Sequence, residues 1–265
     1  MRDIIDMWGN TRMVVLTAMT ASLYAAILIP FKVLPIIPGV TEFRPANAVP
    51  VICSFLFGPA GAWGSAIGNV IGDFFGGLGP GDFFGFFGNF LYGYVPYRVW
   101  TAIMGERDPV PQSPLQWIVF FGVVALASAA CALTIGWGIN LLGFVPFSVL
   151  ANIIFVNNLL VAAVLTPFLL AVIYPRVKSA KLRYLDVLGS PVRRSLPVRA
   201  LGLTLVVCAI VGGMYAGTLL STGRIELPFL AHDAISTAGS PTRAADVGLG
   251  LAPIVLLMLI GLALL

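Results

Sequence analysis

The chain has 265 residues, of which 59% are hydrophobic and only 10% are charged. Soluble domains carry about 25% charged residues, so this composition excludes a soluble protein and predicts a polytopic membrane protein. The net charge of +4 does not indicate nucleic-acid binding, because the basic residues gather at the ends of apolar runs, where they orient membrane helices.

The N-terminal third of the chain contains short and interrupted apolar runs. Residues 13–30 are numerous enough to span the hydrocarbon and are interpreted as a first helix rather than a cleaved signal peptide. A proline-rich loop at 31–47 follows. Residues 48–57 would extend only about 15 Å as a helix, so they form a short helix or half of a broken one. A Gly-Pro turn at 58–61 separates them from a small-residue helix at 62–75.

The remaining apolar runs are longer, and a glycine-rich loop at 76–81 precedes them. Further helices are expected at 83–104, 115–142, 147–174, 200–220 and 247–265, which predicts an all-α transmembrane bundle of eight helices. A strongly basic segment lies between the last two pairs of helices. We therefore divide the chain into a substrate-binding module at 1–178, a basic cytoplasmic linker at 179–199 and a C-terminal hairpin at 200–265.

Two stripes of residues run along the segment 60–76 at helical spacing. Small residues occupy every fourth position, at Ala60, Gly64, Gly68, Gly72 and Gly76. Polar residues follow one position later, at Ser65, Asn69 and Asp73. The small stripe is typical of close helix packing within a membrane protein. Polar side chains exposed to lipid cost free energy, so the polar stripe is expected to face a cavity or a partner. Asp73 lies near the helix end and could also be solvated.

Two topologies fit the charge distribution equally well. If the turn at 58–61 and the N-terminus are both inside, eleven of the 15 basic residues are cytoplasmic. If residues 47–76 form one kinked helix and the N-terminus is outside, eleven are again cytoplasmic. The positive-inside rule therefore does not distinguish a hairpin from a kinked helix here.

Four short motifs resemble the substrate-binding S components of energy-coupling factor (ECF) vitamin transporters, in the riboflavin-type or a related branch. They are FRPANAVP at 43–50, FGPAG at 57–61, GNVIGD at 68–73 and GN at 88–89. The resemblance covers about residues 10–178. It implies six helices with both ends cytoplasmic, which selects the hairpin topology, and it does not account for the last two helices.

The resemblance also implies partners. S components work in the plasma membrane with a transmembrane T component and two ATP-binding-cassette ATPases, which alone use ATP, and no cofactor of its own is expected for this chain. In this family a small-residue face on the first helix docks on the T component. The corresponding residues here are Ala18, Ala21, Ser22, Ala25 and Ala26.

Candidate ligand-binding residues are the polar and aromatic side chains within or beside the helices. They are Glu42, Arg44, Asn69, Asp73, Asn89, Trp137, Asn140, Asn152 and Asn157. The asparagines could instead form hydrogen bonds between helices, and Trp137 could belong to an aromatic belt at the membrane interface. Asparagines on three different helices favour a polar pocket for a small aromatic or heterocyclic molecule.

An enzymatic function is not expected. The only histidine is His232 in a polar loop, and the chain has no phosphate-binding loop with lysine, so it lacks the residues of a metal hydrolase or an ATPase. The predicted function is capture of a vitamin-type ligand from outside for an ECF importer, with the N-terminus in the cytoplasm. A solitary secondary transporter or channel is the alternative, with residues 58–81 as a discontinuous-helix site, and a structural subunit without ligand is a third.

Overall fold

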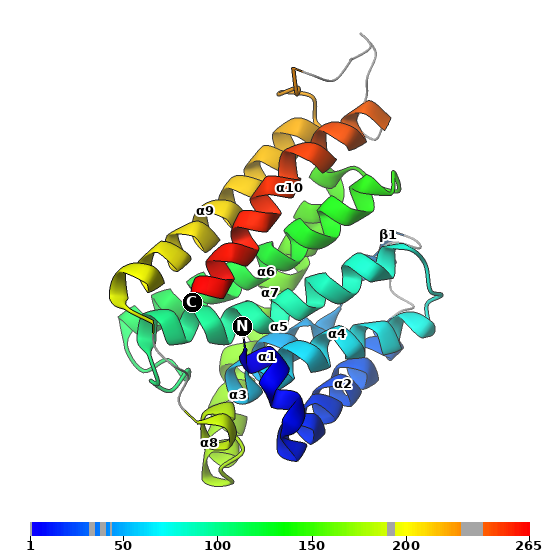
Figure 1. The fold of residues 1–265 in the computed structure, drawn as a ribbon. Coiled ribbons are helices and arrows are strands. Elements are labelled where there is room, and N and C mark those ends of the chain that lie inside the picture. Colours follow the sequence, from blue (N-terminus) through cyan, green and yellow to red (C-terminus); the bar gives the residue numbers. More distant parts are fainter. Residues whose placement is uncertain (1, 32–34, 38–40, 43, 190–193, 229–240) are drawn as a thin grey trace.

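The computed structural model describes residues 2–31, 35–37, 41–42, 44–189, 194–228 and 241–265. They form a bundle of helices with one short antiparallel pair of strands (Figure 1). The elements are α1 (Asp3–Asp6), α2 (Thr11–Phe31), β1 (Pro35–Ile37), β2 (Thr41–Glu42), α3 (Ala48–Phe57), α4 (Pro59–Phe74), α5 (Gly81–Met104), α6 (Pro114–Leu141), α7 (Phe147–Ser179), α8 (Tyr184–Leu188), α9 (Leu196–Ser221) and α10 (Pro241–Leu264), with 3-10 turns at Met7–Gly9 and Pro45–Asn47. The predicted all-α membrane bundle is confirmed.

Five of the described helices are long and apolar enough to cross a membrane by themselves, namely α2, α6, α7, α9 and α10. Helix α3 has only 10 residues and α4 has 16, because together they make a hairpin. Helix α5 has 24 residues, with Asn89 and Arg98 among its aromatic side chains.

The hairpin between α3 and α4 turns at Gly58. Its backbone has φ +53°, a conformation that glycine adopts without the steric cost that a Cβ would add. Three residues further on, a Cβ at Gly61 would collide with the backbone of Cys53 and Ser54, so the two helices touch backbone to backbone. The chain therefore reverses at residue 58, and residues 47–76 are not one kinked helix.

The end of the bundle that carries α1, the Gly58 turn and α8 is called the basic end below. Polar contacts hold its parts together: the Tyr97 hydroxyl donates to Asp3 at 2.7 Å, and the Trp63 indole donates to the carbonyl of Ile4 at 2.8 Å. The ring of Tyr184 covers the Gly58 turn. The N-terminus and the basic segment after α7 thus lie at the same end of the bundle, as the hairpin topology requires.

The small-residue stripe of α4 packs against α2 inside the chain. A Cβ at Gly68 would lie 2.7 Å from the carbonyl oxygen of Ala21, and one at Gly72 would lie 2.5 Å from the side chain of Leu28. The expectation of intrachain packing is confirmed for these positions. Gly76 differs, because α4 ends at Phe74 and Gly76 belongs to the loop that follows.

The C-terminal helices α9 and α10 pair with each other and lie along α6 and α7 (Figure 1). In the figure this yellow and red pair covers the green helices on the side away from the blue α2. The division of the chain at residues 178 and 199 stays a prediction.

Candidate functional site

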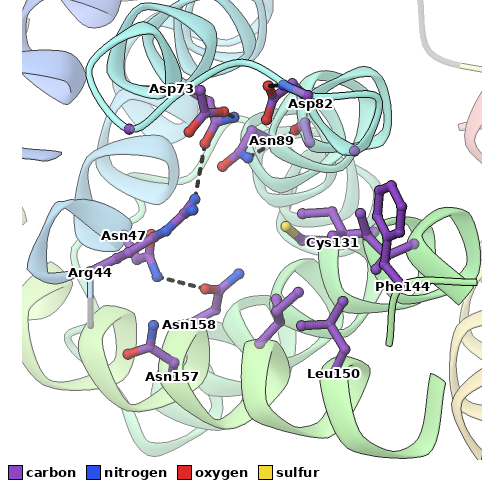
Figure 2. A pocket seen from close by; sticks show the side chains of 18 of the residues that line it. Arg44, Asn47, Asp73, Asp82, Asn89, Cys131, Phe144, Leu150, Asn157 and Asn158 are labelled. Carbon is purple, nitrogen blue, oxygen red and sulfur yellow. Dashed lines mark hydrogen bonds between the residues drawn. The ribbon is translucent and has the colours of Figure 1, made fainter. Parts of the chain in front are cut away.

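A cavity of about 180 Å³ lies at the end of the bundle opposite the basic end. Its walls come from the segment before α3, from α4 and α5, from the loop between these two helices, and from α6 and α7. Figure 2 shows side chains from these separate parts of the chain pointing into one shared space. The volume is below the roughly 300–1,000 Å³ of drug-sized sites, so the cavity suits a small molecule.

One wall carries a buried polar chain from Arg44 to Asp73. The Arg44 guanidinium donates to the Asn69 side-chain oxygen at 3.1 Å, and the Asn69 amide donates to an Asp73 carboxylate oxygen at 2.5 Å (Figure 2). Asn69 and Asp73 lie one helical turn apart on α4 and are 1% and 5% exposed. A carboxylate buried this deeply requires hydrogen bonds or a counter-charge, which Asn69 and the nearby Arg44 supply.

A second polar network crosses the floor of the cavity and begins at Tyr24 of α2. The Tyr24 hydroxyl lies 3.0 Å from the side-chain oxygen of Asn89 and 3.3 Å from that of Asn47. Asn47 in turn donates to the side-chain oxygen of Asn158 at 2.6 Å. A hydroxyl carries one proton, so at any moment Tyr24 donates a full hydrogen bond to only one of the two oxygens, that of Asn47 or that of Asn89. The other oxygen can accept a hydrogen bond from a ligand.

The glycine-rich loop between α4 and α5 borders the cavity, together with an apolar wall from α6 and α7. Asp82 stabilises this loop by accepting a hydrogen bond from the Gly79 backbone at 2.7 Å. Gly77 has φ +95°, which a residue with a side chain rarely adopts. Ile139 of α6 and Leu150 of α7 are apolar lining residues, and Ile139 lies against Gly81 at the end of the loop. The site therefore combines charged and amide groups with aliphatic side chains.

Five of the nine predicted ligand-binding residues line the cavity: Arg44, Asn69, Asp73, Asn89 and Asn157. The side chain of Glu42 lies outside the part of the chain whose side chains the structure describes. This arrangement suits reversible binding of a small molecule with polar edges and apolar faces. Among the described residues no group of His, Cys, Asp and Glu could hold a metal ion.

The structure does not bring Trp137, Asn140 and Asn152 to the cavity, which corrects their assignment as ligand-binding residues. The Trp137 indole donates to the carbonyl of Gly248, and Asn140 accepts from the backbone of Phe147. Asn152 is exposed and donates to its own helix at Ser148. These side chains lie on other faces of α6 and α7. The spacing of residues along a helix does not show which of its faces borders the cavity.

The predicted docking face on the first helix divides into two parts. Ala18, Ser22 and Ala26 are exposed on the outer side of α2. Ala21 and Ala25 are each only 4% exposed, and Ala21 contacts α4 at Gly68. Ala21 and Ala25 are therefore packing residues within the chain, which corrects their assignment to the docking face.

Sequence reasoning missed several residues that line or support the cavity: Tyr24, Asn47, Asp82, Cys131 and Asn158. Asn47 lies within the FRPANAVP motif and Asn158 is adjacent to Asn157, so the sequence could have predicted both as lining residues. Tyr24 gave no signal, because a tyrosine in an apolar helix is common and its hydrogen bonds cross to distant segments.

One comparison with known proteins identifies a related family. The model of the QueT transporter family matches residues 14–175, which run from α2 to near the end of α7 and supply every wall of the cavity. Helices α9 and α10 lie outside the matched region. Comparison with curated proteins and with solved structures finds no match.

Proposed function

The chain belongs to the QueT transporter family, whose members are ECF-type S components, and we propose that its cavity captures a precursor of queuosine for import. Queuosine is a nucleoside built on 7-deazaguanine, so its precursors are small heterocycles. The proposal replaces the broader expectation of a vitamin-type ligand. The observation that carries it is the buried polar cavity enclosed by helices of the matched region.

The chemistry of the cavity supports a deazaguanine ligand. Such a base has a flat apolar face, N–H groups along one edge and a carbonyl oxygen beside them. Asn47 and Asn89 share a single hydroxyl proton, so one of their oxygens is available to a ligand N–H. Arg44, which lies beside Asn47 in Figure 2, and the Asn69–Asp73 pair supply further charged and amide groups. Leu150 and its neighbours offer an apolar surface for the ring.

With the hairpin topology given, the charges favour one orientation of the protein in the membrane. The basic segment after α7 and the N-terminus lie at the same end, and basic loops remain in the cytoplasm. The N-terminus is then cytoplasmic in the plasma membrane, and the cavity opens toward the outside. This orientation suits an importer that collects its ligand from the medium.

Transport requires partners in this proposal. The chain has no phosphate-binding loop with lysine, so the energy comes from two ATPase subunits that act through a T component. The outer side of α2, with Ala18, Ser22 and Ala26, is the surface for the T component, because exposed small residues let a second helix approach closely.

Uptake and binding measured on one pair of variants test the proposal. Purified protein in lipid nanodiscs should bind queuine, the free base of queuosine, and cells that also express the T component and the ATPases should accumulate it. Replacing both Ala18 and Ser22 with leucine should abolish uptake and leave queuine binding unchanged. Ala252→Leu, at an exposed position of α10, is the matched control and should retain both.

Two outcomes would contradict the proposal. If the purified protein does not bind queuine or a related deazaguanine, the substrate assignment is wrong. If uptake proceeds at the same rate without the ATPases, the protein works as a solitary secondary transporter instead.

A further inference from the structure

Helices α9 and α10 form a hairpin that the family match does not include. Among the described residues, the side-chain hydrogen bonds from this hairpin to the rest of the chain go to two places near the cavity: the first turn of α7 and the last turn of α6. These contacts indicate a specific role for the C-terminal hairpin, and the role proposed below rests on the proposed ligand-binding function of the cavity.

The first turn of α7 has no N-terminal cap of its own. Its N-cap residue is Pro146, whose side chain cannot accept a hydrogen bond from the exposed backbone N–H groups. Two other helices supply the missing acceptors. Asn140 at the end of α6 accepts from the Phe147 N–H at 2.9 Å, and the hydroxyl of Ser221 at the end of α9 accepts from the Ser148 N–H at 3.1 Å.

The Phe147 ring joins the same three helices by packing. It is completely buried between Gly136 of α6 and Gly217 of α9. A Cβ at Gly217 would lie 2.5 Å from the ring, so the glycine is required for this approach. The ring and the cap together fix the start of α7 against the C-terminal hairpin.

Helix α10 holds the end of α6 in a similar way. The Trp137 indole donates to the Gly248 carbonyl at 3.1 Å, and the Asn140 amide donates to the Ala244 carbonyl at 3.4 Å. Asn140 thus bonds α10 with its nitrogen and α7 with its oxygen. Both ends of the α6–α7 turn are attached to the hairpin.

This turn is one wall of the cavity. Ile139 lies next to Asn140, Phe144 lies within the turn, and Leu150 lies one helical turn after the capped N–H groups, and all three line the cavity. We propose that the C-terminal hairpin is a brace that positions the α6–α7 wall of the ligand cavity, with Ser221 and Gly217 as its positioning residues. The hairpin acts through this wall, and none of its described residues, 196–228 and 241–265, lines the cavity.

Hydrogen exchange in the full-length protein tests the cap directly and needs no ligand. Ser221→Ala removes the acceptor of the Ser148 N–H, so exchange of that amide should accelerate at least tenfold, and Ser221→Thr, which keeps the hydroxyl, should restore protection. Thr218→Ala is the matched control, because the Thr218 hydroxyl donates within its own helix to Met214 at 2.8 Å. This control should leave exchange in α7 unchanged.

Ligand binding tests whether the brace serves the cavity. Gly217→Leu should displace Phe147 and weaken queuine binding at least fivefold, mainly through faster dissociation. Gly212→Leu is the matched control on the same helix, where an added Cβ would meet nothing within 4 Å, and its affinity should equal that of the unmodified protein. Ser221→Ala, which deletes one oxygen only, provides the same measurement if Gly217→Leu does not fold.

Each other result overturns the proposal. Unchanged exchange at Ser148 in Ser221→Ala would show that the hairpin does not hold α7. Faster exchange with unchanged queuine affinity would show that the cap has no bearing on the cavity. If the unmodified protein binds no queuine, the proposed substrate is wrong. The brace is then tested by measuring the rate at which Cys131, in the cavity wall, reacts with a small thiol reagent in a Cys208→Ser background. Equal rates in Gly217→Leu and Gly212→Leu would then overturn it.

Discussion

Replacing Tyr24 with phenylalanine removes one buried oxygen at the point where α2 meets the cavity. Tyr24 is 0% exposed, and the space of one hydroxyl oxygen is too small to admit a water molecule in its place. The side-chain oxygens of Asn47 and Asn89, at 3.3 and 3.0 Å from the hydroxyl, lose their shared donor. A buried acceptor left without a partner costs about 1–3 kcal/mol, so the free energy of unfolding of the ligand-free protein should fall by about this amount.

Ligand affinity should fall as well, because both amides lose the contact that orients them toward the cavity. A loss of about 1–1.4 kcal/mol corresponds to roughly five- to tenfold weaker binding. Calorimetric titration of queuine into nanodiscs measures the affinity, and thermal unfolding without ligand measures the stability. Tyr215→Phe is the control, since Tyr215 is 70% exposed on α9 and should change neither quantity.

Equal or tighter queuine binding by Tyr24→Phe would refute this reasoning, because the network would then not orient the cavity asparagines. Unchanged stability together with unchanged affinity would show that Asn47 and Asn89 find other donors without cost.

Three further results are expected. Asn89→Ala should weaken queuine binding roughly five- to a hundredfold, whereas Asn152→Ala, outside the cavity, should not, and equal calorimetric affinities of the two variants would contradict the site. A cysteine at Thr41, in a protein without other cysteines, should react with a membrane-impermeant thiol reagent on intact cells; reaction only after lysis would reverse the proposed orientation. Gly68→Leu should lower the free energy of unfolding by about 1–3 kcal/mol through overpacking against α2, while Gly122→Leu, with open space around it, should leave it unchanged in denaturation experiments.

Much of the fold was predictable because membrane helices are recognised by local composition. The short helix at 48–57 coincides with α3, and the Gly-Pro turn after it was recognised from residues 58–61. Charge counting did not decide between a hairpin and a kinked helix, because both topologies place the same number of basic residues inside. The contact of Gly61 with the backbone of Cys53 decided in favour of the hairpin.

The candidate site was predictable only where its residues share one helix. Asn69 and Asp73 are four positions apart on α4, so their common face follows from helical geometry. Asn140, Asn152 and Asn157 are all asparagines in or at the ends of apolar helices, so the sequence does not distinguish them. In the structure Asn140 faces α10 of the hairpin, and Asn152 lies on the exposed side of α7. Which face of a helix meets the cavity depends on the neighbours of that helix, and the arrangement of neighbours is not a local property.

The sequence by itself determined that this protein is a helical membrane bundle of the S-component type, because hydropathy, length and short motifs are local properties of the chain. Only the tertiary structure separated the two sides of α2, burying Ala21 against α4 and leaving Ala18 exposed. Likewise, only the tertiary structure joined Tyr24 to Asn47 and Asn89, and Ser221 to the start of α7. These contacts connect residues between 23 and 73 positions apart, and such pairs are decided by helix packing rather than by any local pattern.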